Sequence, residues 1–315
     1  MKKTLVFPGQ GSQFIGMGKD VYDAYPVAKA VFQEVDDALG KNLSDLIFKG
    51  EDADLNMTEN TQPALMAVSV AITRVLEDQG KLDIAGDDSI VFSAGHSLGE
   101  YSALTATGAL QLADTARLLQ IRGRAMQQAV PVGIGAMAAI LGLDFEEVKK
   151  IADEVSGEEV CTAANDNANG QVVVSGHKGA VEAAVALAGE RGARKSVMLP
   201  VSAPFHCPLM QPAADRMAEA LDAVTIQSPI VPLIANVGAQ AVSDPDEIKK
   251  LLVEQVTGSV RWRESVLYMK SQGVEHLIEI GAGKVLTGLT RRIDKDLTGQ
   301  AVQNAENIKD FGAEA

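Results

Sequence analysis

The sequence predicts an α/β protein whose large domain is interrupted by a small domain with a ferredoxin-like order of elements. Strand-like and helix-like segments alternate along most of the 315 residues, which is typical of a sheet covered by helices. Residues 130–200 instead follow the order β-α-β-β-α-β, which is the ferredoxin-like signature. We therefore predict a discontinuous large domain, residues 1–129 and 201–315, and an inserted small domain at 130–200.

The first part of the large domain is predicted from apolar runs and helical periodicity. Its first strand ends at Pro8-Gly9, and its second strand precedes a glycine-rich turn. The predicted elements are a strand at 4–7, helices at 21–39 and 63–79, a strand at 89–93, and helices at 99–107 and 112–129.

The inserted domain combines four short strands with two helices. Asp144 is a suitable N-cap for its first helix. The segment NDNANG at 165–170 is a strong turn signal, so we place one strand before it and one after it. The predicted elements are a strand at 136–141, a helix at 145–155, strands at 159–163 and 171–175, a helix at 180–191 and a strand at 195–199.

The last part of the chain returns to the large domain. Gly281-Ala282-Gly283 is predicted to open the last helix, which ends near Ile293. The elements predicted before it are a helix at 209–221, a strand at 231–236, helices at 246–254 and 262–272, and a strand at 276–280.

Composition excludes several classes of protein. With 28 Lys and Arg against 42 Asp and Glu, the net charge is −14, which argues against nucleic-acid binding and weakly against an acidic protein partner. No apolar run reaches about 18 residues, so no membrane span is expected. The apolar start is too short for a signal peptide. Cys161 and Cys207 lack metal-ligand spacing, so we expect buried thiols, no metal and a reducing cytoplasm.

Gly95-His96-Ser97-Leu98-Gly99 matches the pattern G-x-S-x-G between a predicted strand and a predicted helix. In that setting a strained turn exposes the serine hydroxyl as a nucleophile. The alternative is that Ser97 only caps the helix. We favour the nucleophile because an N-cap alone needs no glycine on both sides.

A serine nucleophile needs a base, and the chain offers four histidines. His206 is favoured because it lies in a loop between a strand and a helix and follows Ser97 in the chain, the order common at such sites. The alternative is a loop histidine bonded only to backbone. No acid is evident as a third member, but a backbone carbonyl can orient an imidazole equally well.

Two further features could serve a reaction at Ser97. The loop PGQGSQ at 8–13 is neither a dinucleotide fingerprint nor a P-loop, and it is either half of an oxyanion hole or only a tight turn. Arg117, Arg122 and Arg124 lie on the helix after the serine motif. Most helix arginines are solvated, but one that points into a cleft would hold a substrate carboxylate.

Five segments in order carry a resemblance that covers essentially the whole chain. They are FPGQGSQ at 7–13, GHSLGEYSAL at 95–104, NDNANGQ at 165–171, APFHCPLM at 203–210 and GVEHLIEIGAGKVLTGLTRRI at 273–293. Together they resemble the malonyl-CoA:acyl-carrier-protein transacylases of bacterial fatty acid synthesis. The resemblance implies an α/β-hydrolase-like large domain with a ferredoxin-like insert, which agrees with the organisation above.

The resemblance also implies a mechanism. Ser97 is acylated by malonyl-CoA, and His206 takes the hydroxyl proton and returns it to the leaving thiol. The backbone N–H groups of Gln10 and Leu98 form the oxyanion hole. The phosphopantetheine thiol of an acyl carrier protein then attacks the malonyl-serine ester, in a ping-pong cycle that needs no cofactor. The enzyme is expected to be a cytoplasmic monomer.

Residues that recognise the substrate follow from the same resemblance. Arg122 pairs with the malonyl carboxylate, and the backbone carbonyl of Gln255 orients His206, which accounts for the missing acid. Asn165 is expected to contact the substrate. Phe205 favours malonyl, because related polyketide acyltransferases that use malonyl have phenylalanine at this place.

Two other functions remain open. A serine esterase or thioesterase could use the same nucleophile, although Arg122 and the absent acid favour the transacylase. A non-catalytic scaffold that binds a carrier protein would need the serine motif only as a turn.

The C-terminal part carries a local excess of basic residues. From residue 261 to residue 295 there are seven Lys and Arg against four Asp and Glu, so this stretch is +3 within a −14 chain. Because charge can be spread unevenly, net charge is a poor guide to partners. We predict that Lys284, Arg291 and Arg292 form a docking patch for the acidic carrier protein.

Overall fold

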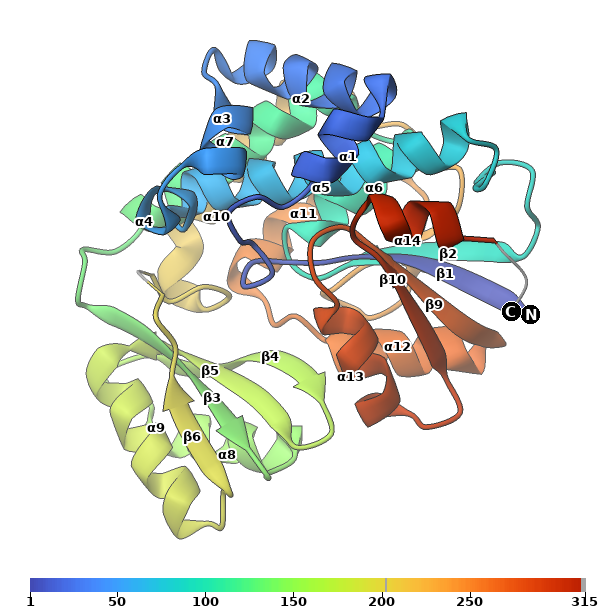
Figure 1. The fold of residues 1–315 in the computed structure, drawn as a ribbon. Helices are drawn as coiled ribbons and strands as arrows, with labels where there is room; N and C mark the ends of the chain where they lie inside the picture. The colour runs from blue at the N-terminus through green and yellow to red at the C-terminus, as the bar shows by residue number, and fades with distance from the viewer. Residues whose placement is uncertain (202, 313–315) are drawn as a thin grey trace.

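The computed structural model describes residues 1–201 and 203–312 and contains two separate β-sheets (Figure 1). Neighbouring strands of the larger sheet are parallel except for its last pair, and those of the smaller sheet are all antiparallel. In spatial order the larger sheet contains β10 (Thr298–Val302), β9 (Val274–Ile280), β1 (Lys2–Phe7), β2 (Ile90–Gly95), β7 (Leu233–Ile234) and β8 (Ala241–Val242).

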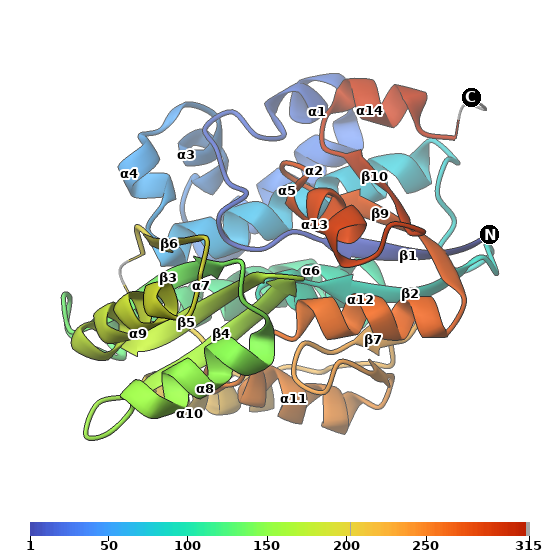
Figure 2. The same cartoon turned by 90° about the horizontal axis from the view of Figure 1, so that it is seen from below.

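Helices cover both faces of the larger sheet, with α5 and α6 on one side and α12 and α13 on the other (Figures 1 and 2). The helices of this part are α1 (Lys19–Ala24), α2 (Pro26–Leu39), α3 (Leu43–Lys49), α4 (Asp52–Leu55), α5 (Thr58–Asp78), α6 (Gly99–Ala106), α7 (Leu112–Gln128), the 3₁₀ helix η1 (Pro208–Met210), α10 (Gln211–Asp222), α11 (Pro245–Thr257), α12 (Trp262–Ser271), α13 (Val285–Ile293) and α14 (Ala305–Asp310).

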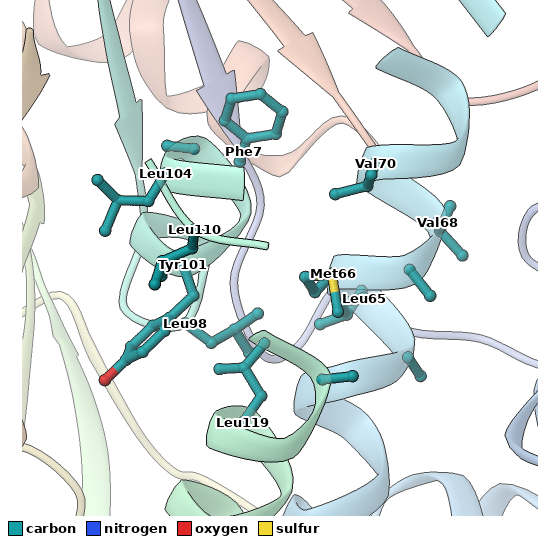
Figure 3. Close-up of a cluster of buried hydrophobic side chains, with 14 of the residues drawn as sticks. Phe7, Leu65, Met66, Val68, Val70, Leu98, Tyr101, Leu104, Leu110 and Leu119 are labelled. Carbon is teal, nitrogen blue, oxygen red and sulfur yellow. The ribbon is translucent and has the colours of Figure 1, made fainter. Parts of the chain in front are cut away.

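Strand β1 shows why the larger sheet needs helices on both sides. Leu5 and Phe7 belong to the core formed with α5 and α6, whereas Val6 between them belongs to the core formed with α12 and α13. All three side chains are fully buried. Burial of each contributes about 1.5–3 kcal/mol, so an apolar run without alternation specifies this central parallel strand. Figure 3 shows Phe7 in the first of these cores, beside residues of α5 and α6.

The small sheet contains, in spatial order, β4 (Cys161–Ala168), β5 (Gln171–His177), β3 (Gly135–Leu141) and β6 (Lys195–Met198). Helices α8 (Phe145–Val155) and α9 (Lys178–Glu190) pack on one of its faces, where Val172 and Val174 are buried. Its other face turns toward the large domain, and Val173 and Met137 join the large core. This element order and strand order confirm the predicted ferredoxin-like unit. The domain boundaries at 130 and 200 stay a prediction.

Three parallel strands end together at one edge of the larger sheet. Phe7 at the end of β1 pairs with Gly95 at the end of β2, and Ala94 pairs with Ile234 at the end of β7. The loops that follow these strands therefore begin side by side. Ligand sites of parallel sheets form at this edge, where the strands' carboxyl ends meet.

Several predicted elements were wrong in extent. The single helix predicted at 21–39 is two helices, because Tyr25 is extended, with φ −128° and ψ 121°, and Pro26 begins the second. The predicted turn NDNANG is mostly strand, since β4 continues to Ala168 and only Asn169 and Gly170 form the turn. Polar contacts to the large domain, described below, keep this hydrophilic segment extended.

Other elements were missed or shortened. The chain does not end its regular structure with α13, because β10 and α14 follow it. Helices α3 and α4 and strand β8 were not predicted, and the strand expected at 231–236 is reduced to Leu233–Ile234. The helix expected to start at Pro63 begins at Thr58. Within the described residues, no helix has the length and apolar character that a membrane span requires.

Candidate active site

Ser97 lies in a strained turn between β2 and α6. Its φ is 54°, in the left-handed region that non-glycine residues rarely adopt. A Cβ on Gly95 would lie 1.9 Å from the carbonyl carbon of Gly99, and a Cβ on Gly99 would lie 2.3 Å from the carbonyl oxygen of Phe7. The two glycines thus let strand and helix approach closely enough to form this turn, as at a nucleophile elbow.

The hydroxyl of Ser97 faces His206. Ser97 Oγ lies 2.8 Å from His206 Nε2, and His206 Nδ1 lies 2.8 Å from the backbone carbonyl oxygen of Gln255. Because that carbonyl can only accept, Nδ1 carries the ring proton and Nε2 is left to accept from the serine. No side chain caps α6, so the view of Ser97 as only a helix cap is not supported.

Burial sets the protonation state of His206. The ring is 4% exposed, and burial together with the positive charge of Arg122 lowers the pKa of His206 to about 3. Hydrogen bonds to the carbonyls of Gln255 and Gly258 oppose this shift but do not outweigh it. His206 is therefore neutral near pH 7 and able to accept a proton.

The other three histidines have partners elsewhere. His96 Nε2 lies 2.8 Å from Asn167 Oδ1, His177 Nδ1 accepts the N–H of Val160, and His276 Nδ1 lies 2.7 Å from Thr298 Oγ1. His96 directly precedes Ser97 in the chain, but its ring contacts Asn167 and not the Ser97 hydroxyl. Of the four histidines, His206 is the one whose ring contacts Ser97 Oγ.

The two predicted oxyanion donors lie near Ser97, since Gln10 lines the same cavity and Leu98 is the next residue in the chain. Within the described residues, neither Gln10 N–H nor Leu98 N–H donates a hydrogen bond to the protein. The side chain of Leu98 points into the core beside Tyr101 and Leu119, which fixes its backbone at the start of α6 (Figure 3). Ser97 N–H, by contrast, donates to Asn236 Oδ1 over 2.7 Å. Unpaired N–H groups at this place can stabilise a developing oxyanion.

Arg122 of α7 is the arginine that points into the site. It is 1% exposed, its Nη1 donates to Gln62 Oε1 over 2.8 Å, and its Nη2 donates to Gln255 Oε1 over 2.8 Å and to Ser97 Oγ over 3.1 Å. Its buried Nε has no partner among the described residues. Burial lowers the pKa of Arg122. No carboxylate of the described chain forms an ion pair with this guanidinium.

The two neighbouring arginines lie on the surface instead. Arg117 pairs with Asp114 over 3.2 Å, and Arg124 pairs with Glu59. Both side chains are more than half exposed, at 53% and 54%. The helical spacing alone could not separate Arg122 from these two.

The reactive groups open into a cavity of about 160 Å³ between the two sheets. The small sheet contributes polar and apolar side chains to its wall, and Phe205 and His206 also line it. A second cavity, of about 460 Å³, adjoins the first and shares Gln10 and Val201 with it. The residues that line the first cavity are Gln10, Gln62, His96, Ser97, Arg122, Met126, Met137, Asn165, Asn167, Val173, Leu199, Val201, Phe205 and His206.

Sequence reasoning missed four polar residues of this site. Gln62 and Asn236 lie far from Ser97 in the chain and carry no local signal. Glu100 stands within the serine motif segment, but its role depends on contacts with distant residues. Asn167 was quoted only as part of a motif. Burial raises the pKa of Glu100 to about 8, opposed by the N–H groups of Asn236 and Gln255 and by the charge of Arg122.

The predicted docking residues lie on and before α13. Lys284, Arg291 and Arg292 are exposed and form no ion pair with the described residues. Arg292 Nη1 instead donates to Gln171 Oε1 of the small sheet over 2.5 Å. A Cβ on Gly283, next to Lys284, would lie 3.8 Å from Ser12, so this segment adjoins the loop that contains Gln10.

A metal site is not evident in the described part of the chain. No three His, Cys, Asp or Glu side chains cluster there in a way that could hold a metal ion. Cys161 and Cys207 are free and buried, and burial raises the pKa of both thiols.

Comparison with known proteins places this geometry in a family. The family described as "Acyl transferase domain" matches residues 4–309. Malonyl CoA-acyl carrier protein transacylase of Escherichia coli K12 is 48% identical over 95% of both chains, and that of Bacillus subtilis is 46% identical over 98% of this chain and 95% of its own.

Solved structures agree with this finding. Acyl-carrier-protein-S-malonyltransferase from Bartonella henselae has a TM-score of 0.95 and 55% identity, over 98% of both chains. A malonyl-transacylase in complex with a holo type II PKS acyl-carrier protein has a TM-score of 0.94 and 42% identity, over 99% of both chains.

Proposed function

The chain belongs to the acyl transferase family and, within it, to the malonyl CoA-acyl carrier protein transacylases, and from this premise we propose that it transfers a malonyl group from malonyl-CoA to the phosphopantetheine thiol of an acyl carrier protein. One observation carries the proposal furthest. Arg122 is a buried guanidinium 3.1 Å from Ser97 Oγ and has no carboxylate partner in the described chain. A substrate with a free carboxylate supplies that partner.

In the first half-reaction Ser97 Oγ attacks the thioester carbonyl carbon, and its proton passes to His206 Nε2. The charge that develops on the carbonyl oxygen is stabilised by the N–H groups of Gln10 and Leu98. The carbon–sulfur bond then breaks, and His206 returns the proton to the CoA sulfur. Burial disfavours the imidazolium, so the proton does not remain on the ring. Ser97 is left as the malonyl ester.

The second half-reaction reverses these steps with a new thiol. The carrier protein's thiol gives its proton to His206 Nε2 as its sulfur attacks the ester carbonyl carbon. The bond from that carbon to Ser97 Oγ breaks, and the proton returns to Ser97 Oγ. The same base and the same oxyanion contacts serve both halves, so the cycle needs no cofactor.

Arg122 accounts for the choice of acyl group. A malonyl carboxylate must stay ionised inside the cavity, and an unpaired buried charge is costly. The guanidinium pairs with it, whereas an acetyl group leaves the guanidinium without a carboxylate partner. The cavity of about 160 Å³ suits the acyl group, and the adjoining cavity of about 460 Å³ offers room for the rest of the thioester.

We extend the proposal to the remaining site residues. Asn165 and Phe205 line the cavity beside the acyl group, and Phe205 favours malonyl over methylmalonyl by limiting its size. Lys284, Arg291 and Arg292 receive the acidic carrier protein. The enzyme acts as a cytoplasmic monomer.

Intact-mass measurement after incubation with malonyl-CoA tests the function. We expect a stable adduct of one malonyl group that is absent in Ser97→Ala. A serine esterase or thioesterase would instead release CoA rapidly, with no adduct and no need for a carrier protein. A non-catalytic scaffold would show neither adduct nor CoA release, and Ser97→Ala would leave its affinity for the carrier protein unchanged.

The role of Arg122 is tested by comparing two acyl donors. In Arg122→Ala we expect malonyl transfer to fall about 100-fold while acetyl transfer persists or rises, because only malonyl loses its ionic partner. Arg117→Ala is the matched control, since Arg117 lies on the same helix but is exposed. Equal losses for malonyl and acetyl in Arg122→Ala would refute the selectivity role.

A further inference from the structure

We propose that Glu100 is a positioning residue that fixes Gln255, and through it Arg122, in the orientation that selects a malonyl group; this inference rests on the proposed function. Glu100 is the second residue of α6 and is 1% exposed. It touches neither the cavity nor the reacting atoms. Its effect on the site must therefore pass through other residues.

Gln255 contacts Ser97, His206 and Arg122. Its backbone carbonyl oxygen lies 2.8 Å from His206 Nδ1, and its side-chain Oε1 accepts from Arg122 Nη2 over 2.8 Å. Its side-chain Nε2 donates to the carbonyl oxygen of Ser97 over 2.9 Å and to Glu100 Oε2 over 2.5 Å. Both hydrogens of the amide nitrogen and its oxygen are thereby used inside a fully buried side chain.

The orientation of the Gln255 amide is set by what surrounds it. The carbonyl oxygen of Ser97 and Oε2 of Glu100 each accept a hydrogen bond from Gln255 Nε2, whereas the guanidinium of Arg122 only donates. A turn of the amide by 180° would place its NH₂ group against Arg122 and its oxygen against two acceptors. Glu100 therefore helps to keep an acceptor facing Arg122, and this acceptor holds Nη2 beside Ser97.

The second oxygen of Glu100 is also committed. Glu100 Oε1 accepts the backbone N–H of Asn236 in a short contact. Asn236 in turn accepts Ser97 N–H at its Oδ1 and donates from Nδ2 to the carbonyl oxygen of Gly95 over 2.7 Å. A backbone N–H cannot be turned around, so one side of Glu100 always faces a donor.

A glutamine at position 100 cannot satisfy both neighbours. Its oxygen can accept from only one of the two donors, Asn236 N–H or Gln255 Nε2, and its NH₂ group must face the other. Because the Asn236 donor is backbone, the conflict falls on Gln255, whose side chain must shift or turn. Either change removes the acceptor from Arg122 Nη2 while leaving the Gln255 carbonyl with His206. The nucleophile and its base are then retained, and the grip on the substrate carboxylate is loosened.

The test measures acylation of Ser97 by malonyl-CoA and by acetyl-CoA, using intact mass over time, in wild type, Glu100→Gln and Glu100→Asp. In Glu100→Gln we expect the malonyl-to-acetyl rate ratio to fall about 10-fold or more, as when a hydrogen bond to a charged group is lost. Glu100→Asp keeps two acceptor oxygens but withdraws them by one methylene, so its ratio should fall by a smaller factor, about threefold.

Ser102→Ala is the matched control, because Ser102 lies on the same helix, is buried, and has a hydroxyl without a partner among the described residues. Its ratio should equal that of wild type. An unchanged ratio in every folded Glu100 variant would overturn the inference, as would equal losses for both donors, which would indicate only a structural role. Failure of wild type to take a malonyl group on Ser97 would instead overturn the proposed function.

Discussion

The two sheets border the catalytic cavity in different ways. The larger sheet presents strand ends, where the loop after β1 contributes Gln10 to the cavity and the turn after β2 contributes Ser97. The small sheet presents a face, from which Asn165, Asn167 and other side chains form the wall. The strand ends thus position Ser97 and the neighbouring backbone N–H groups, whereas the small sheet supplies side chains of the wall. The hydrogen bonds along two paired strands fix the position of the strand ends. We therefore expect residues at these ends to be held more firmly than side chains on the face of the small sheet.

The attachment of the small sheet supports the same contrast. Strand β4 is joined to the large domain by Asp166 N–H, which donates to the Val260 carbonyl oxygen over 2.9 Å, and by Val260 N–H, which donates to the Ala164 carbonyl oxygen over 2.8 Å. Arg263 Nε adds bonds of 3.0 and 2.9 Å to the two carboxylate oxygens of Asp166. These polar contacts add to the apolar contacts that Val173 and Met137 of the small sheet make with the large core.

The largest effect is expected at the reacting edge of the larger sheet. His206→Ala should lower acylation of Ser97 by about 10³-fold or more, because no other histidine ring contacts the hydroxyl. Asn167→Ala, on the small-sheet wall, should cost about 10-fold or less under the same mass-spectrometric assay. Similar losses in the two variants would remove the distinction between reacting edge and wall.

Replacing a glycine by alanine should change the free energy of unfolding in opposite directions in the two domains. Gly99→Ala places a Cβ 2.3 Å from the carbonyl oxygen of Phe7, so we expect a loss of about 2–3 kcal/mol in the free energy of unfolding, measured by urea denaturation. Gly189→Ala in α9 of the small domain meets no atom within 4 Å and should stabilise by about 0.5–1 kcal/mol. A tolerated Gly99→Ala would contradict the close approach of strand and helix.

Removing the ion pair between the domains should have a smaller effect. Asp166→Asn leaves Arg263 without its carboxylate, and we expect a loss of about 1–2 kcal/mol, because the arginine side chain is 26% exposed and can be hydrated. Acylation of Ser97 should remain close to wild type, since Asp166 does not line the cavity. A loss of acylation without a loss of stability would show that β4 does more than form a wall.

Charge reversal at the predicted docking residues tests whether binding of the carrier protein is separate from acylation of Ser97. Reversing Arg291 and Arg292 to Glu should raise the KM for the carrier protein about 3- to 10-fold and leave acylation by malonyl-CoA unchanged. Reversing Lys149 and Lys150 of α8 changes the net charge equally and is the control. The same rise in KM in both double variants would indicate a general effect of net charge.

The smallest change is expected when the pH is varied. The pKa of His206 is lowered to about 3, so the ring stays neutral, and able to accept a proton, until the pH approaches that value. Acylation measured as kcat/KM should therefore be nearly constant from pH 8 to pH 5, whereas an ordinary histidine would lose about 30-fold. Because the unfolded chain binds this proton more readily, the contribution of His206 to stability is lost as pH falls below about 6.5 toward 3. If kcat/KM instead fell to half its maximum near pH 6.5, the pKa of His206 would be that of a solvent-exposed histidine, which would contradict this prediction.

The sequence by itself determined the features that depend on neighbouring residues. The turn at Ser97 could be predicted because Gly95 and Gly99 stand on both sides of it, and the helix Phe145–Val155 because its cap and periodicity are local. The ferredoxin-like order also follows from local patterns. The family resemblance added the predicted roles of Gln10, Arg122 and Gln255, which no local pattern separates from their neighbours.

Only the tertiary structure decided which polar groups meet. The bond from Ser97 N–H to Asn236 joins residues 139 positions apart, and the bond from Arg122 to Gln255 joins residues 133 positions apart. The strand through Asn165 and Asn167 was predicted as a turn because its composition favours one, and the large domain supplies the partners that keep it extended. Local propensity is a weak preference of about 1 kcal/mol, and it yields wherever burial and distant hydrogen bonds favour another conformation.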